Sequence, residues 1–152
     1  MAGHLFRFKE LRIGEFRTER PYLNVKLTGP LDALPIVMLV DSGSDVSMIQ
    51  LDLAEHLGLP MESAERTRGT AGGVDVFSTQ VQAEIFHGEN LLPPLDLPVQ
   101  VPTERGLPPI ALLGREVFFY EYDISFRMAD APSEGAFVLS PVTHRRDARD
   151  SK

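Results

Sequence analysis

The stretch MLVDSGSDVSMI, residues 38–49, brings an aspartate to the end of an apolar run. Residues 36–40 are continuously apolar and partly β-branched, so we expect a short buried strand there rather than a helix. The strand ends at Asp41, which is followed by Ser42, Gly43, Ser44 and a second aspartate, Asp45. A carboxylate at this place, among small residues and hydroxyls, has two interpretations.

The simpler interpretation is a turn, because Asp-Ser-Gly is common in turns and needs no further explanation there. The other interpretation is a reactive site. Gly43 would then let a substrate or another backbone approach closely. Ser42 would hold the loop in place, and Ser44 would donate a hydrogen bond to the carboxylate or to a ligand.

A single carboxylate is a poor catalyst of amide hydrolysis. The reaction needs one group that takes a proton from water and another that donates one. Two adjacent carboxylates supply both functions, because they share one proton. This chain has a single strand-Asp-Ser-Gly, and Asp75, Asp96 and Asp123 lie in other contexts. If Asp41 is catalytic, its simplest partner is Asp41 of a second copy, related by a two-fold axis.

Composition excludes several other classes of function. The 152 residues suit one domain, and their net charge of −7 disfavours nucleic acid or an anionic membrane as a partner. No apolar run approaches the roughly 20 residues of a membrane span. The N-terminus lacks the apolar core of a secretory signal, so a cytoplasmic location is expected. The chain has no cysteine, and its four histidines form no metal motif, so we expect neither metal nor cofactor.

The rest of the chain indicates a mostly β protein with one clear helix and a second, brief one. Residues 22–29 alternate as a half-buried strand with Leu23, Val25 and Leu27 on its apolar face. Residues 50–59 have helical spacing, with Gly58 as the cap and Pro60 as the stop. Residues 65–86 indicate a long hairpin with glycines at its tip.

The remaining segments are shorter. Alternation in residues 4–13 predicts a strand, and the prolines of residues 90–102 exclude a helix and a central strand. We expect a strand at 110–113, one or two helical turns at 114–119, an alternating strand at 120–126 and a last strand at 135–141. Tyr120 is placed in the alternating strand.

Three elements in this order resemble those of retropepsin-like aspartic proteases, the single-domain homodimeric relatives of pepsin. VDSGSD (40–45) resembles their active-site loop, with Asp41 as the catalytic carboxylate. GTAGG (69–73) resembles the Gly-rich flap that closes over substrate. ALLGRE (111–116) resembles the apolar-apolar-Gly element that packs beneath the loop and leads into the C-terminal helix. The resemblance covers roughly residues 20–141.

This resemblance implies a fold, a partner and roles for individual residues. The fold is a closed, barrel-like acid-protease domain with a flap hairpin, over residues 20–141, between an N-terminal arm (1–19) and a charged tail (142–152). The activity is cleavage of peptides or unfolded proteins by a homodimer, without metal or cofactor. Ser42 would bond across the dimer axis, and Asp45 would contact substrate and pair with Arg115. The further implied residues are Thr70, Ala71, Gly72 and Gly73 for substrate binding, and Leu113 and Gly114 as support.

The chain also departs from the family pattern. Ser44 stands where Ala is usual, and it adds a hydroxyl that would bond the ionised carboxylate. The flap has no aromatic residue at its tip, and Phe77 is the nearest. The viral relatives build a four-stranded dimer sheet from both termini, whereas both ends are longer here. Apolar pocket walls are suggested at Val74, Val76, Leu107, Pro108 and Ile110.

Two other hypotheses remain. The same fold can serve as a non-catalytic dimerisation or peptide-binding module. A turn-rich β-sandwich unrelated to acid proteases would make the order of the three elements a coincidence. The intact Asp-Ser-Gly favours the enzyme, since a binding module needs no carboxylate at that place.

Overall fold

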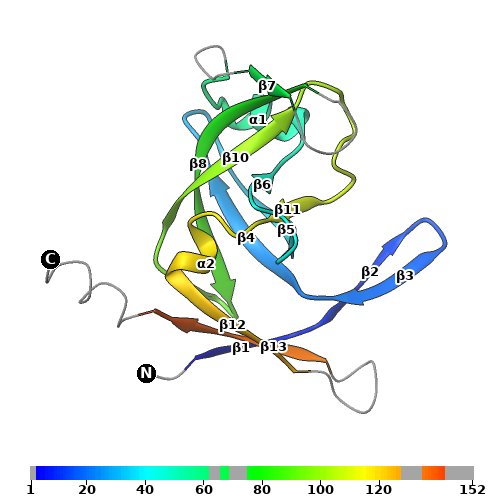
Figure 1. The fold of residues 1–152 in the computed structure, drawn as a ribbon, viewed down its shortest axis with the longest axis vertical. Coiled ribbons are helices and arrows are strands. Elements are labelled where there is room, and N and C mark those ends of the chain that lie inside the picture. The colour runs from blue at the N-terminus through cyan, green and yellow to red at the C-terminus, as the bar shows by residue number, and fades with distance from the viewer. Residues whose placement is uncertain (1–2, 62–65, 69–74, 128–134, 143–152) are drawn as a thin grey trace, which may run out of the picture. The chain divides into compact units, whose positions relative to one another are not determined.

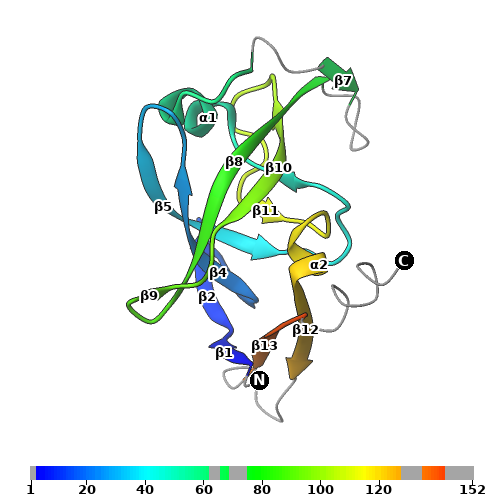
Figure 2. The same cartoon turned by 90° about the vertical axis from the view of Figure 1, so that its left-hand side faces the viewer.

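Six strands close into a barrel between Tyr22 and Val117 (Figure 1). The computed structural model describes residues 3–61, 66–68, 75–127 and 135–142. Around the barrel the strands are β10 (Leu95–Pro102), β6 (Ser47–Met48), β11 (Ala111–Leu113), β5 (Ala33–Val40), β4 (Tyr22–Thr28) and β8 (Asp75–His87). Pairing of β8 with β10 closes the ring, and the two strands run side by side in Figures 1 and 2. The predicted mostly β, barrel-like fold is thereby confirmed.

The chain divides into two compact units. Residues 22–117 form the barrel unit, and residues 1–21 together with 118–152 form a second, which we call the terminal unit. Neither helix in the described part of the chain is long and apolar enough to cross a membrane.

Strand β4 shows why the barrel has an apolar interior. Its predicted alternation is confirmed, because Leu23, Val25 and Leu27 are fully buried while Asn24 is exposed. The strand pairs antiparallel with β5 on one side and with β8 on the other, so its apolar face points into the closed ring. Burial of such side chains contributes roughly 1.5–3 kcal/mol each.

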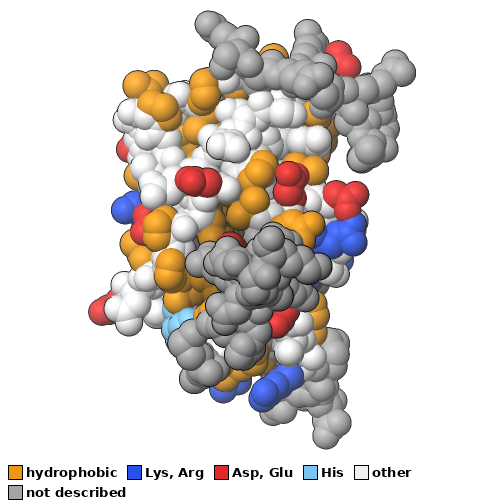
Figure 3. Space-filling view, turned by 60° about the vertical axis from the view of Figure 1, so that its left-hand side comes forward, with side chains coloured by type: hydrophobic (Ala, Val, Ile, Leu, Met, Phe, Trp, Pro, Cys, Tyr) orange, Lys and Arg blue, Asp and Glu red, His pale blue; other side chains and the backbone are white. Residues whose placement is uncertain are grey.

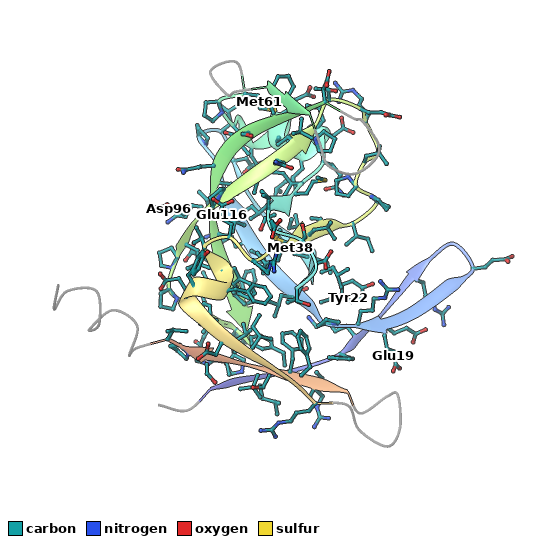
Figure 4. All side chains as sticks on the ribbon, viewed as in Figure 1. Glu19, Tyr22, Met38, Met61, Asp96 and Glu116 are labelled. Carbon is teal, nitrogen blue, oxygen red and sulfur yellow. The ribbon has the colours of Figure 1, made fainter. Side chains whose placement is uncertain are left out.

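Strand β5 is buried on one face only, unlike the continuously buried strand expected from its sequence. Met38 and Val40 are buried, whereas Val37 is 38% exposed. Alternate residues of a barrel strand point inward and outward, so an apolar run fills the core with every second residue. Met38 lies among the side chains inside the barrel (Figure 4).

Helix α1 (Leu51–Leu57) ends as predicted at Gly58, which adopts a left-handed conformation with φ of 71°. The Gly58 N–H donates to carbonyls of the last helical turn. Ala54 and Leu57 form the buried face of the helix. The backbone N–H of Leu31 donates to the Leu57 carbonyl (3.0 Å), so the end of α1 is joined to the turn between β4 and β5.

The predicted long hairpin is confirmed at its base. Strand β7 (Arg66–Arg68) pairs antiparallel with β8, with Thr67 opposite Val76. The tip, residues 69–74, lies outside the described residues. The short β9 (Asn90–Leu91) pairs with the other end of β8.

Strand β10 corrects the expectation that its prolines exclude a central position. The whole strand pairs with β8, and Val99 and Gln100 also pair with β6, so these two residues have neighbours on both sides. The two-sided stretch lies between Pro98 and Pro102, so neither proline, which lacks an N–H, falls within it.

The terminal unit contains a hairpin and a three-stranded sheet. The hairpin joins β2 (Lys9–Ile13) to β3 (Phe16–Arg20), and the sheet has the order β1 (His4–Arg7), β13 (Ala136–Pro141), β12 (Tyr122–Arg127). The single strand expected at residues 4–13 is therefore two strands, interrupted at Phe8, whose N–H donates to Gly135. Phe6 stacks on the fully buried Phe137 with 5.3 Å between the ring centroids.

The second helix is displaced from its predicted place. Helix α2 spans Phe118–Glu121, and it includes the exposed Tyr120, which the sequence had placed in a strand. The expected helical turn from Gly114 does not form because Val117 has a φ of 66°, a left-handed conformation that interrupts a right-handed helix. The following strand β12 begins at Tyr122, and its alternation then follows the prediction.

The left-handed Gly58 yields a test of stability. Gly58→Ala should lower the free energy of unfolding by about 1–2 kcal/mol, because an L residue is strained there. A new Cβ would also lie 2.4 Å from Cγ of Leu31, a side chain that is 76% exposed and has room to move. Urea unfolding followed by circular dichroism measures the change.

Gly88→Ala is the matched control. Gly88 has φ of 64°, and a Cβ added there would meet no atom of the described residues within 4 Å, so only the backbone cost applies. Gly58→Ala should be at least as destabilising as Gly88→Ala. A Gly58→Ala protein as stable as wild type would contradict the role of the cap.

Candidate active site

Asp41 lies immediately beyond β5, where the backbone still follows the β5–β11 pairing. Its N–H donates to the Leu113 carbonyl (3.0 Å), which extends that parallel ladder by one bond. The Gly43 N–H donates to Asp41 Oδ1 (3.0 Å), and the Ser44 N–H donates to the Asp41 carbonyl (3.2 Å). The half-buried carboxylate is thus held by its own loop, while Ser42 and Gly43 beside it are exposed.

Gly43 leaves room for close approach to this carboxylate. A Cβ at Gly43 would lie 3.2 Å from Asp41 Oδ1, closer than almost all real contacts of this kind. A larger residue would therefore crowd the oxygen that accepts the Gly43 N–H.

Ser44 does not use its hydroxyl as the sequence suggested. Its Oγ donates to the Val46 carbonyl at 2.7 Å, so this proton stabilises the turn into β6 instead of bonding Asp41. The expectation of a hydroxyl on the carboxylate is corrected, because the nearer carbonyl two residues along takes the donor.

Gly114 packs directly against the Asp41 loop. A Cβ there would lie 2.5 Å from the carbonyl carbon and oxygen of Val46 and 3.0 Å from the Ser44 carbonyl oxygen. These are backbone atoms, which cannot swing aside, so only glycine fits. The predicted support by the Leu113–Gly114 element therefore has a steric basis in this structure.

Ser47 is a supporting residue that the sequence analysis missed. It is fully buried, and its Oγ accepts the Gly114 N–H at 2.9 Å. A buried N–H without a partner is costly, so this hydroxyl allows the two loops to be close. The only signal in the sequence is a serine between Val46 and Met48, which does not distinguish a buried acceptor from an exposed residue.

Two further backbone bonds join the loops. The N–H groups of Arg115 and Glu116 donate to the carbonyls of Ser44 and Asp45, each at 2.9 Å. The Arg115 guanidinium also forms an ion pair with the Asp45 carboxylate, as the sequence predicted. Both side chains remain mostly exposed, at 53% and 80%, so the pair contributes little to stability.

The next residue, Val117, has a φ of 66°. This left-handed conformation is unfavourable for a β-branched side chain and costs on the order of 1–3 kcal/mol. It turns the chain directly after the contact between Glu116 and Asp45. No pattern in the sequence indicated this strain.

The remaining predicted site residues fall into two groups. Thr70, Ala71, Gly72, Gly73 and the pocket residue Val74 lie outside the described residues. Of the other suggested pocket walls, Val76 is buried, Leu107 is 37% exposed, and Pro108 and Ile110 are half-buried.

The arrangement offers carboxylate chemistry. Among the described residues no cluster of three or more His, Asp or Glu could hold a metal ion. On the face shown in Figure 3, the acidic side chains are scattered among other side chains. The visible part of this face therefore has no concentrated acidic patch. Within the loop, Arg115 engages Asp45, and Asp41 is the carboxylate beside exposed small residues.

Several solved structures are similar to this chain at low sequence identity. A retropepsin-like aspartic protease from Rickettsia conorii matches with a TM-score of 0.52 and 16% identity, over 91% of this chain and 94% of that one. EIAV protease in complex with the inhibitor HBY-793 matches with a TM-score of 0.41 and 20% identity, over 67% and 88% of the chains. The retroviral protease-like domain of Ddi1 from Leishmania major has a TM-score of 0.37 and 18% identity, over 80% and 96%.

A search of curated proteins finds no match. The model of the aspartyl protease family matches residues 23–117, a range that nearly coincides with the barrel unit and includes both loops of the site. With well over half of its length matched, the chain belongs to the aspartyl protease family.

Proposed function

We propose that the chain is an aspartic endopeptidase that acts as a homodimer, with one Asp41 from each copy forming the catalytic pair. The observation that carries the proposal is the environment of Asp41. Its carboxylate is half-buried, fixed by the Gly43 N–H and bordered by exposed small residues. The packing of Gly114 and Ser47 beneath the loop supports a fixed position for it.

The need for a second copy follows from acid-base chemistry. One group must accept a proton from water while another donates to the substrate. Asp45, the second carboxylate of the loop, forms an ion pair with Arg115, so Asp41 is the carboxylate of the loop without such a cation beside it in the described residues. A two-fold axis that brings two Asp41 side chains together would supply the missing group.

In the proposed reaction, the two Asp41 carboxyl groups share one proton and hold a water molecule. The ionised group takes a proton from the water, whose oxygen attacks the scissile carbonyl carbon. The protonated group meanwhile donates a hydrogen bond to the carbonyl oxygen. A proton then passes to the leaving amine nitrogen as the C–N bond breaks. Two coupled carboxyls of this kind would give a bell-shaped dependence of activity on pH.

The other residues of the loop would bind and orient the substrate. Ser42 would bond across the axis, Gly43 would allow the substrate backbone to approach, and Asp45 would contact the substrate main chain. Thr70, Ala71, Gly72 and Gly73 would cover an extended peptide and pair with it like a strand. The substrate class is a peptide or an unfolded protein segment.

Asp41→Asn should abolish cleavage, with a loss of at least about 100-fold, because an amide neither takes nor donates the required proton. The fold should persist, since the Asn Oδ1 can still accept the Gly43 N–H. Wild type and variant are incubated with a diverse peptide pool between about pH 3 and pH 7, where coupled carboxylates titrate. Mass spectrometry identifies the cuts.

Cleavage by clean, folded Asp41→Asn protein at the wild-type rate would refute the catalytic role of Asp41. If folded, dimeric wild type makes no cuts and both proteins bind peptides equally, the non-catalytic binding module replaces the enzyme.

Ser47→Ala should lower the free energy of unfolding by about 1–3 kcal/mol, because it leaves the buried Gly114 N–H without its acceptor. Activity should fall as well, since the Asp41 loop loses a support. Thr103→Ala is the control: the Thr103 hydroxyl also bonds a backbone group, donating to the Asp75 carbonyl, but at an exposed place. Chemical unfolding and peptide cleavage are measured together, and equal effects of the two variants would contradict the role of Ser47.

Asp45→Asn should raise KM more than it lowers kcat, because the proposed role of Asp45 is to bind substrate. Stability should change by less than about 1 kcal/mol, since the ion pair with Arg115 is exposed. Asp52→Asn is the control, because it removes a similar exposed pair with Arg105 outside the loop. Steady-state kinetics that show a loss of kcat alone would exclude the binding role.

A further inference from the structure

The negative charge of the chain is concentrated in the barrel unit. Residues 22–117 contain thirteen Asp and Glu side chains against five Lys and Arg, which gives a net charge of −8. The remaining residues contain nine acidic and ten basic side chains, a net charge of +1, and the two values account for the −7 of the whole chain. Charge that served solubility alone would have no reason to avoid one unit. Because the Asp41 loop belongs to the acidic unit, a substrate that approaches it meets a negative field.

Two basic side chains of the barrel unit lie beside its loops, and acids already engage both. Arg115 forms an ion pair with Asp45 next to the candidate site. Arg105, in the loop between β10 and β11, forms ion pairs with Asp52 and Glu55 of α1, so two acids surround one cation there. These cations therefore leave no excess of positive charge that could attract an acidic substrate.

Two exposed glutamates lie on segments that frame the candidate site. The backbone N–H of Glu116 donates to the Asp45 carbonyl at 2.9 Å, so this residue lies on the segment that crosses the catalytic loop. Glu104 follows Thr103, whose N–H donates at 2.9 Å to the Asp75 carbonyl at the base of the β7–β8 hairpin. Both glutamates are exposed, and neither forms an ion pair with a side chain that the structure describes.

We propose that the substrate of the Asp41 site is a cationic peptide segment, with Lys or Arg on either side of the scissile bond. This inference rests on the proposed function and names the substrate class for the same site. The acidic side chains visible in Figure 3 are scattered, so the attraction acts through their summed field and not through one pocket. Such steering speeds association by roughly 10- to 1,000-fold and weakens as salt is added.

The apolar residues suggested as pocket walls are compatible with a cationic substrate. Leu107, which is 37% exposed, and the half-buried Pro108 belong to the same loop as Glu104. This loop therefore presents apolar surface and a negative charge within a few residues. A peptide with apolar side chains at the scissile bond and basic side chains on its flanks matches both.

Matched peptide pools test the substrate class. Two pools share a centre of about six randomised uncharged residues, and they differ only in their ends, which carry two Lys in one pool and two Glu in the other. At about pH 6, where carboxylates are ionised, and roughly 20 mM salt, wild type should cleave the Lys-flanked pool at least about tenfold faster. At roughly 0.5 M salt, where the screening length is only about 4 Å, the two rates should become similar.

Charge reversal at Glu116 tests where the preference comes from. Glu116→Lys keeps the backbone bond to Asp45. It should lower kcat/KM for a Lys-flanked peptide from the cleaved pool roughly fivefold or more at low salt, mainly by raising KM. Glu89→Lys is the matched control, because it makes the same change in net charge. Glu89 is exposed in the turn after the 13-residue strand β8, at the end away from the hairpin and roughly 40 Å along the strand. Its reversal should change kcat/KM by less than about twofold.

Binding to a protein that cannot cut separates this inference from the proposed function. Fluorescence anisotropy with Asp41→Asn protein should show that the labelled Lys-flanked pool binds more tightly than the Glu-flanked pool at low salt. The difference should disappear at high salt, and circular dichroism shows that each variant is folded.

The outcomes distinguish the two proposals. Cleavage of both pools at equal rates, or a preference that salt does not reduce, overturns the cationic substrate while the peptidase stands. Equal effects of Glu116→Lys and Glu89→Lys also overturn it, because the charge beside the site then selects nothing. Salt-sensitive, preferential binding of the Lys-flanked pool without cleavage by wild type supports selection by charge, in which case the catalytic proposal alone fails.

Discussion

The close approach of Gly114 to the backbone of Val46 is the constraint on which the candidate site depends. At this point the short strand β11 lies between β5 and β6, and the segment that leaves β11 passes the loop between β5 and β6 at backbone distance. A side chain at residue 114 would separate them. The buried Ser47 hydroxyl then satisfies the Gly114 N–H, and the next two N–H groups bond to the carbonyls of Ser44 and Asp45. The position of the Asp41 loop thus depends on this one backbone contact and the hydrogen bonds around it.

This contact also gives the two carboxylates of the loop, Asp41 and Asp45, different surroundings. The bond from Gly43 to Asp41 is by itself what an ordinary Asp-Ser-Gly turn would make, and it does not identify a catalyst. The difference lies in what surrounds the turn. Arg115 is carried to Asp45 by the Gly114 segment, so one acid has a cationic partner, while the other stands half-buried beside exposed small residues.

Sequence reasoning succeeded where one local pattern decides the outcome. The alternation along β4 follows from the spacing of its apolar residues, and the end of α1 follows from its glycine. The distant pair of Asp45 with Arg115 was foreseen only through the family resemblance. Sequence reasoning failed where a distant partner decides. The two-sided pairing of β10 and the acceptor role of Ser47 each depend on a segment far along the chain, and no local pattern encodes them. The left-handed conformation of Val117 has no local signal either. The second helix was misplaced because the left-handed Val117 interrupts the segment in which it was expected.

The Asp41 loop offers one carboxylate for proton transfer where the chemistry needs two. A two-fold axis is the simplest way for a single chain to supply both. A single chain with one Asp-Ser-Gly loop therefore points to a paired site built from two copies rather than to a second acid elsewhere in the same chain.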